Sequence, residues 1–191
     1  MGYSTDFTGH FTITPPLQPA HQVLLAELTR TRREIRDGSK LPPAPSWVND
    51  GSWGQQGEFY TAVLAEMVIS GITPEQYLTD AQIYQDLIDH FGFNKGQDDD
   101  MGLVNYNESG IQPSLWLQWV PQDSTRLVWD EGENFYNYVE WLVYLIKQVF
   151  QPNGYTLNGR VEYQGEDLCD NGYIEVTNNQ VNHVETNECN G

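Results

Sequence analysis

The sequence predicts an α+β fold, a two-layer sandwich in which two long helices cover one face of a mainly antiparallel sheet of about five strands. Three observations support this prediction. Apolar and polar residues alternate over residues 3–14, a strongly apolar helix is predicted at 133–150, and the predicted elements follow the order β-α-β-β-α-β-β. A helical insertion at about 41–114 interrupts this order. With 191 residues, the chain is expected to form a single domain, residues 1–191, with a loose tail at 186–191.

The helix predicted at Glu133–Phe150 is the element around which the sheet has to be arranged. Its apolar residues recur at helical spacing and leave only a narrow polar face. The main apolar stripe consists of Phe135, Tyr138, Val139, Leu142, Ile146 and Val149. A helix that is apolar over so much of its surface needs a broad partner, and a sheet face is the usual one. Charges interrupt the run, which is shorter than the ~20 apolar residues of a membrane span, so a buried helix is predicted.

Alternation with a period of two predicts the strands of the sheet. Strands are expected at 3–14, 115–121, 125–130 and 155–164, and a last one at 173–177 that continues past an Asn-Asn interruption at 181–185. Pro15-Pro16 ends the first strand, because proline cannot donate to a sheet ladder. The face of the sheet opposite the helices is expected to be polar and exposed to solvent. It would present Asp6, Thr8, His10, Thr12, Asn158, Arg160, Glu162 and Gln164.

Further helices are predicted at 19–36, 58–70 and 74–91. Pro19 suits a first helical turn, and Asp37-Gly38 provides a C-terminal stop. The basic stretch at the end of that helix, TRTRREIR at 29–36, is expected to interact with the helix dipole rather than to bind an anion. Thr73-Pro74-Glu75-Gln76 matches a capping box and opens the last of these helices, which belongs to the insertion.

Acidic residues dominate the charge of the chain. It contains 27 Asp and Glu against nine Lys and Arg, a formal net charge of −18 at pH 7. Residues 1–40 hold five basic and four acidic residues, net +1, and the remainder holds four basic and 23 acidic residues, net −19. Such a field repels nucleic acid and anionic membranes, and it attracts cations or basic protein surfaces, including those of nucleic-acid-binding proteins. Solubility alone is the other explanation of this charge.

Neither a secretion signal nor a metal-binding motif is recognised in the sequence. No apolar segment follows a basic start, and none is long enough to span a membrane, so cytoplasmic residence is expected. Cys169 and Cys189 could pair, but the missing secretion signal favours free thiols. No cysteine or histidine spacing matches a zinc site, and no cofactor is expected.

Several motifs resemble those of a family of small bacterial and phage-borne proteins of uncharacterised function. These motifs are Gly2–Phe7 (GYSTDF), Leu115–Pro121 (LWLQWVP), Phe135–Leu142 (FYNYVEWL), Gly154–Gly159 (GYTLNG) and Gln164-Gly165-Glu166. The resemblance covers roughly the first 36 residues and Gln97–Thr177, but not the helical block between them. It implies a bacterial or phage origin and a cytosolic protein. It implies no activity, cofactor or catalytic residue.

Two loops could bind a ligand in principle. Asp98, Asp99 and Asp100 form the sharpest carboxylate cluster, but they lack the alternate spacing and the glycine of a calcium-binding loop. A solvated loop is therefore favoured over a metal site, and no metal ligand is assigned. The glycines of residues 51–57 follow no buried strand, so a phosphate-binding loop is not predicted there.

The polar sheet face carries the best candidate for catalysis. His10 shares this face with Asp6 and Glu162, and His183 lies on another strand and is expected to be able to approach it. A histidine base oriented by a carboxylate would need such an arrangement. No motif of a catalytic nucleophile accompanies these residues, so no catalytic residue is assigned.

The favoured hypothesis is an acidic, non-enzymatic protein-interaction domain that acts through its negative surface. A phage-encoded inhibitor of a host or defence protein, including one that mimics nucleic acid in a basic groove, is its sharpest form. The candidate partner-binding residues are Asp6, His10, Glu162, Asp98, Asp99 and Asp100. The alternative is a small-molecule-binding protein or an enzyme that uses His10, Asp6 and Glu162. Exposed sheet edges also predict pairing with a second copy of the chain.

Overall fold

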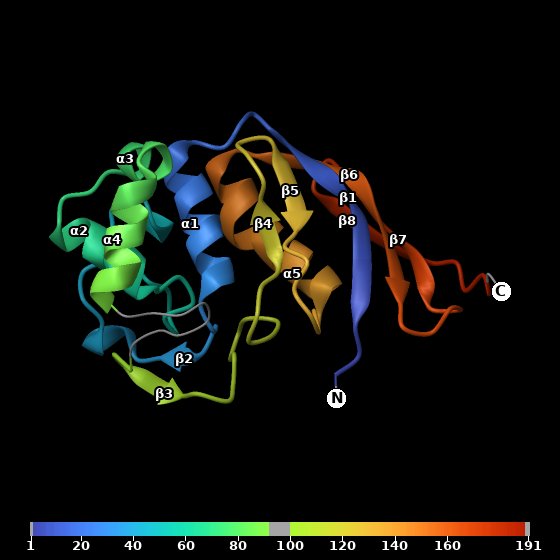
Figure 1. Cartoon of the computed structure of the whole chain (residues 1–191), viewed down its shortest axis with the longest axis horizontal. Coiled ribbons are helices and arrows are strands. Elements are labelled where there is room, and N and C mark those ends of the chain that lie inside the picture. The colour runs from blue at the N-terminus through green and yellow to red at the C-terminus, as the bar shows by residue number, and fades with distance from the viewer. Residues whose placement is uncertain (1, 92–99, 190–191) are drawn as a thin grey trace. The chain divides into compact units, whose positions relative to one another are not determined.

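The computed structural model of the protein describes residues 2–91 and 100–189, which fall into two compact units (Figure 1). The first unit comprises Met1–Leu17 and Leu117–Gly191, and the second comprises Gln18–Trp116. The fold is α+β, as the sequence predicts, with a six-stranded antiparallel sheet and a separate two-stranded sheet. No helix among the described residues combines the length and the apolar character that crossing a membrane requires.

Six strands build the sheet of the first unit. They are β1 (Thr5–Thr14), β4 (Trp119–Pro121), β5 (Arg126–Trp129), β6 (Thr156–Gly165), β7 (Asn171–Thr177) and β8 (Gln180–Glu185). Their spatial order is β4-β5-β1-β6-β7-β8, and all neighbours are antiparallel. β1 pairs with β6 along its whole length, from Thr5 opposite Gly165 to Thr14 opposite Thr156. β4 is shorter than the predicted strand at 115–121, and the Leu115 carbonyl accepts a hydrogen bond from the Arg33 N–H at 2.8 Å.

The two faces of the sheet differ as the alternation predicts. Phe7, Phe11 and Ile13 of β1 are buried, and the residues between them are exposed. The predicted polar face is therefore confirmed. Its exposed members are Asp6, Thr8, His10, Thr12, Arg160 and Glu162, and its half-buried members are Asn158 and Gln164.

Helix α5 (Tyr138–Leu145) packs against the apolar face and continues as a π-helical turn over Ile146–Phe150. The helix contacts β4 and β8, and the turn contacts β6. Its buried residues are Trp141, Leu142, Leu145, Ile146, Val149 and Phe150. The prediction that this stretch lies against a sheet is confirmed. The helix begins later than Glu133, because Asn134 and Asn137 both adopt a left-handed backbone conformation with φ 56°.

An aromatic cluster fills the space between the start of α5 and the sheet. The Phe7 ring centroid lies 5.3 Å from that of Trp119, 5.9 Å from that of Phe135 and 4.9 Å from that of Tyr138. Trp119 is fully buried, and its indole N–H donates to the Tyr138 carbonyl at 2.9 Å. Because edge-to-face ring pairs contribute about 0.5–1.5 kcal/mol beyond their buried area, this cluster stabilises the helix on the sheet.

β1 and β6 approach each other closely at two glycines. Gly9 has φ +116° and Gly159 has φ +145°. A Cβ at Gly9 would lie 2.7 Å from the Arg160 carbonyl oxygen, and one at Gly159 would lie 2.7 Å from the His10 carbonyl oxygen. Glycine is therefore needed at both positions, for its positive φ and for its missing side chain.

The second unit contains four helices and a two-stranded sheet within the described residues. These elements are α1 (Pro19–Arg30), β2 (Ile35–Arg36), α2 (Ala62–Ile69), α3 (Pro74–Thr79), α4 (Ala81–Phe91) and β3 (Leu103–Asn105). Short 3₁₀ turns lie at Gly38–Lys40 and Asn49–Gly51. α1 contacts α2 and α3, and β2 pairs antiparallel with β3.

The predicted capping box at the start of α3 is confirmed. The Thr73 hydroxyl accepts from the Gln76 N–H at 3.2 Å, and the Gln76 side-chain oxygen accepts from the Thr73 N–H at 2.9 Å. The single helix predicted over 74–91 is instead two helices. Asp80 lies between α3 and α4 with φ −123° and ψ 97°, which is extended backbone.

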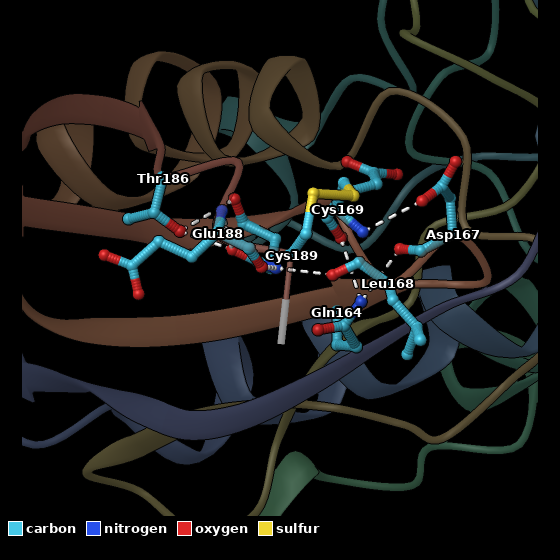
Figure 2. The surroundings of a disulfide bond; sticks show 9 residues. Gln164, Asp167, Leu168, Cys169, Thr186, Glu188 and Cys189 are labelled. Carbon is cyan, nitrogen blue, oxygen red and sulfur yellow. Dashed lines mark hydrogen bonds between the residues drawn. A yellow bond between two sulfur atoms is a disulfide. The ribbon is translucent and has the colours of Figure 1, made fainter. Parts of the chain in front are cut away.

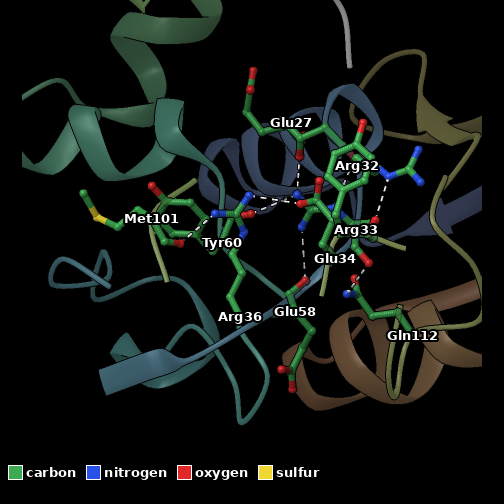
Figure 3. A network of polar contacts seen from close by, with 11 residues as sticks. Glu27, Arg32, Arg33, Glu34, Arg36, Glu58, Tyr60, Met101 and Gln112 are labelled. Carbon is green, nitrogen blue, oxygen red and sulfur yellow. Dashed lines mark hydrogen bonds and ion pairs between the residues drawn. The ribbon is translucent and has the colours of Figure 1, made fainter. Parts of the chain in front are cut away.

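The helix predicted at 19–36 ends at Arg30, because Thr31 is extended with φ −121° and ψ 150°. Arg33 and Arg36 therefore lie beyond α1, and the predicted interaction with its dipole is wrong for them. Figure 3 shows that they belong to a buried polar network instead.

The two arginines of this network bind carbonyl groups from distant loops. Arg33 is 2% exposed and donates to the carbonyl oxygens of Glu58 at 3.3 Å and Tyr60 at 2.9 Å. Arg36 is 3% exposed, donates to the Met101 carbonyl at 2.7 Å and pairs with Glu34. Buried charges are tolerated when they are hydrogen-bonded in this way, so the basic stretch organises the loops of the second unit.

Candidate binding site on the polar sheet face

A pocket of about 370 Å³ opens on the polar face of the sheet in the first unit. β1, β6 and β7 form its floor, and the segment after β8 adds to its wall. Its carboxylates are Asp6, Glu162 and Glu188. Its neutral polar side chains are Thr8, Gln164, Asn171 and Thr186. Arg160 and Tyr173 complete the polar lining.

The strand register brings these residues together in two rows across the sheet. Asp6 pairs with Gln164, which pairs with Asn171. In the next row, Thr8 pairs with Glu162, which pairs with Tyr173. Residues paired across strands share a face and lie about 5 Å apart, so residues far apart in the chain line one pocket. The prediction that Asp6 and Glu162 share this face is confirmed.

His10 lies on the same face but does not line the pocket. It belongs to the following row, opposite Arg160, which in turn pairs with Glu175. His183 does not approach His10, and that prediction is wrong. His183 pairs with Ile174 and thereby faces the apolar side of the sheet, and two strands, β6 and β7, separate it from β1.

On the apolar side, His183 takes part in a different cluster. Its Nε2 lies 3.0 Å from the Tyr163 hydroxyl, and its ring lies beside that of Tyr138. Burial raises the pKa of Tyr163 to about 12, with Glu185 and Asp170 adding to the effect. Tyr138 also has its pKa raised, mainly by burial. A histidine with two neutral phenols lacks the orienting carboxylate of the predicted catalytic group.

The predicted aspartate cluster lies in the other unit. Asp98 and Asp99 are outside the described residues, and Asp100 is exposed and does not line the pocket. Within residues 2–91 and 100–189, no group of three or more His, Cys, Asp or Glu side chains is placed to hold a metal ion.

Among the described residues, the pocket contains three carboxylates, Asp6, Glu162 and Glu188, and one basic side chain, Arg160. Arg160 approaches Glu162 at 3.7 Å, with the two side chains 49% and 69% exposed, an arrangement that contributes little in water. The Arg160 guanidinium also lies over the Tyr173 ring, 3.5 Å from its centroid. The carboxylates of Asp6 and Glu188 make no hydrogen bond or ion pair with other described side chains or backbone groups. The pocket therefore offers hydrogen-bond acceptors with unused capacity.

The wall of the pocket is held by a disulfide bond between Cys169 and Cys189 (Figure 2). The expectation of free thiols is wrong. Residues 186–189, expected as part of a loose tail, are held by this disulfide and by a hydrogen bond that the Asn171 side chain donates to the Glu188 carbonyl at 2.7 Å. The Thr186 hydroxyl in turn donates to the Asn171 side chain.

The Asn178-Asn179 pair is a sequence signal for this disulfide that alternation alone does not reveal, because asparagine favours the positive φ of a two-residue hairpin turn. In the structure both residues have positive φ, 48° and 69°, and form the turn between β7 and β8. In a hairpin centred there, Gly172 pairs with Glu185, so the chain before β7 runs beside the chain after β8. Cys169 and Cys189 lie at these adjacent ends.

Comparison with known proteins adds no assignment to the pocket. No family model matches the chain, and neither a curated protein nor a solved structure matches it. The resemblance to bacterial and phage-borne proteins stays a prediction. The geometry of the polar sheet face and its charges are therefore the basis for a functional proposal.

Proposed function

We propose that this protein is an acidic, non-enzymatic interaction domain that binds a basic protein surface through the polar sheet face. The observation that carries the proposal is the pocket in which Asp6 and Glu188 have no partner among the described residues. Ionised carboxylates accept hydrogen bonds only, so the group that complements them is a donor with positive charge.

The charge of the first unit supports this choice of partner. Residues 1–17 and 117–191 contain 13 acidic and three basic residues, a net charge of −10. A negative surface of this size attracts a cationic partner and speeds the encounter at low ionic strength. It disfavours direct binding of nucleic acid or of an anionic membrane.

The pocket suits a lysine or arginine side chain of that partner. Its volume of about 370 Å³ lies at the small end of the range of ligand pockets, and it is lined mainly by polar groups. The three carboxylates supply acceptors for an ammonium or guanidinium group, while Thr8 supplies a hydroxyl. Tyr173 is already covered by Arg160, so the site does not offer a free aromatic platform.

An inhibitor is the form of this function that the sequence expectations favour. By occupying a basic groove, for example that of a nucleic-acid-binding protein, the acidic face would exclude the natural polyanion. A phage-encoded protein directed at a host or defence protein fits this behaviour.

The test is an affinity pull-down from bacterial lysate at low and high salt, followed by mass spectrometry and direct binding to the captured protein. The variant carries Asp6→Asn, Glu162→Gln and Glu188→Gln. The matched control carries Glu75→Gln, Glu133→Gln and Glu140→Gln, which change the charge equally on exposed residues that do not line the pocket.

Binding should weaken about tenfold or more in the pocket variant, because two or three ion pairs of ~0.5–1 kcal/mol each are lost. It should change little in the control and should fall with added salt. An equal loss of affinity in both variants, or an affinity that does not change with salt concentration, would contradict the proposal.

A small-molecule-binding protein is a second candidate, and the concave shape of the pocket favours it. The lining predicts a small cationic ligand such as a polyamine. Thermal unfolding with and without spermidine distinguishes the two candidates, since a dedicated polyamine site would raise the Tm at micromolar concentration and a protein-binding face would not. Catalysis is not supported, because His10 does not line the pocket.

A further inference from the structure

We propose that the Cys169–Cys189 disulfide is a redox switch for the pocket on the polar sheet face. In the oxidised protein it holds the segment 186–189 in place, and with it the pocket residues Thr186 and Glu188. Reduction would release this segment and remove one carboxylate from the wall. The ligand class in this inference, a cationic side chain, rests on the proposed function, whereas the release of the segment does not.

Apart from the disulfide, the hydrogen bonds of this segment converge on a single residue. The Asn171 carbonyl accepts from the Thr186 N–H at 2.9 Å and from the Asn187 N–H at 3.4 Å. Its side-chain oxygen accepts from the Glu188 N–H at 3.3 Å, and its side-chain N–H donates to the Glu188 carbonyl at 2.7 Å. Anchorage of the segment therefore depends on one residue and one covalent bond.

The location of the segment makes the covalent bond decisive. It follows β8, the outermost strand of the sheet, so it has a neighbouring strand on one side only. Residues Thr186–Cys189 are exposed, and their side chains add no apolar burial. Two of their hydrogen bonds to Asn171, those donated by the Asn187 and Glu188 N–H groups, are long at 3.4 and 3.3 Å. Hydrogen bonds add only modest net stability, because they replace bonds to water in the released chain. Once the disulfide is broken, chain entropy favours release.

The disulfide is also open to a reductant. Cys189 is exposed and Cys169 is half-buried, at the tip of the loop between β6 and β7. A thiolate of a dithiol reductant attacks one sulfur, and the S–S bond breaks with release of the other sulfur as a thiolate. The second thiol of the reductant then displaces the first cysteine. Two electrons pass to the protein, two cysteine thiols form after protonation, and the reductant becomes a cyclic disulfide.

The experiment measures the affinity of the full chain for tetralysine at low ionic strength. The chain is compared oxidised, reduced with dithiothreitol, and reoxidised after removal of the reductant. Reduction should weaken binding about threefold to fivefold, the loss that corresponds to one exposed ion pair, and reoxidation should restore it. In parallel, hydrogen exchange should rise at the amides of 186–189 and stay unchanged in β1 and β6.

Two variants connect the effect to the pocket. Cys169→Ser with Cys189→Ser should behave as the reduced protein whether or not reductant is present. Glu188→Gln should bind tetralysine as weakly as the reduced wild-type chain and should not weaken further on reduction. Glu140→Gln serves as the matched charge control and should keep the full response to reductant. Exchange in β1 and β6 shows directly whether each variant has folded.

The two proposals fail in different ways. If the oxidised chain does not bind tetralysine, the proposed function loses its ligand class, while the exchange data still decide the switch. If oxidised and reduced chains bind equally and the 186–189 amides exchange equally, the switch is overturned and the proposed function stands. If the oxidised chain binds tetralysine and exchange rises on reduction but binding does not fall, the segment moves without serving the pocket, which also overturns the switch.

Discussion

The guanidinium carbon of Arg160 lies 3.5 Å from the centroid of the Tyr173 ring, so the basic group of the pocket stacks on its aromatic neighbour. Arg160 also approaches Glu162 at 3.7 Å. Through these two contacts it occupies part of the space and part of the negative charge that a cationic partner would use. It therefore competes, within the same chain, with the ligand that we propose for the pocket.

Replacing this internal competitor should strengthen the binding of cations. Arg160→Gln removes one positive charge from the pocket and frees the Glu162 carboxylate and the Tyr173 ring. The affinity for tetralysine at low salt should rise about threefold to tenfold, corresponding to ~0.7–1.4 kcal/mol. Calorimetric titration at two salt concentrations checks this. Arg126→Gln on β5 is the control for net charge, and an equal gain in both variants would contradict a local effect.

The close approach of β1 and β6 predicts a large difference between two glycine substitutions. Gly159→Ala places a Cβ 2.7 Å from the His10 carbonyl oxygen at φ +145°, whereas Gly154→Ala has φ +79° and meets nothing within 4 Å. Gly154→Ala should lower the free energy of unfolding by ~1–2 kcal/mol, the cost of a left-handed alanine. Gly159→Ala should lower it by ~3 kcal/mol or more. Urea unfolding measures both, and equal losses would contradict the steric argument.

The buried arginine network predicts that lysine cannot replace Arg33. Arg33 donates to carbonyl groups in different directions, which the forked guanidinium allows and an ammonium on a flexible stem does not. Arg33→Lys should destabilise the second unit by ~2–4 kcal/mol. Arg32→Lys should change stability by less than ~1 kcal/mol, because the Arg32 bond to the Tyr106 carbonyl is exposed. Denaturant unfolding and limited proteolysis of residues 42–61 would reveal the difference.

Tyr163 predicts a specific weakness of the fold at alkaline pH. Burial, with help from Glu185 and Asp170, raises the pKa of Tyr163 to about 12 in the folded protein, against ~10 in an unfolded chain. Its folded-state pKa is raised, so the stability it contributes is complete below pH ~10 and is lost as the pH rises toward 12.

The measurement for Tyr163 is denaturant unfolding at a series of alkaline pH values. In the wild-type chain, Tyr163 adds up to ~1.4 kcal/mol per pH unit to the slope of the free energy of unfolding above pH ~10. Tyr163→Phe should make that slope shallower, although it also removes the contact with His183. An unchanged slope would show that the phenol is not protected from ionisation.

The sheet and its faces were predictable because they depend on local alternation. Phe7 and Asp6 must face opposite ways wherever β1 lies in the sheet, and the same holds for Val161 and Glu162 on β6. The capping box at Thr73 is also local. The split between α3 and α4 was not predictable from periodicity, since the apolar spacing continues through Asp80 while the backbone there is extended.

The candidate site was predictable only in part, for the same physical reason. Asp6 and Glu162 follow from alternation, but the contact between β1 and β6 depends on the strand order, which alternation does not determine. His183 was therefore placed near His10 when it faces the other side. Asn171 and Glu188 were missed, because their contact needs the hairpin register and the disulfide.

The position of β1 has a consequence for synthesis on the ribosome. β1 is translated before the other strands of its sheet, and its neighbours β5 and β6 both follow the complete second unit in the chain. When the ribosome has synthesised residues 18–116, the second unit can begin to fold. At that point the strands that pair with β1 are still missing, so Phe7 and Phe11 remain uncovered. Until β6 emerges, the apolar face of β1 stays uncovered, and a holdase chaperone would recognise it.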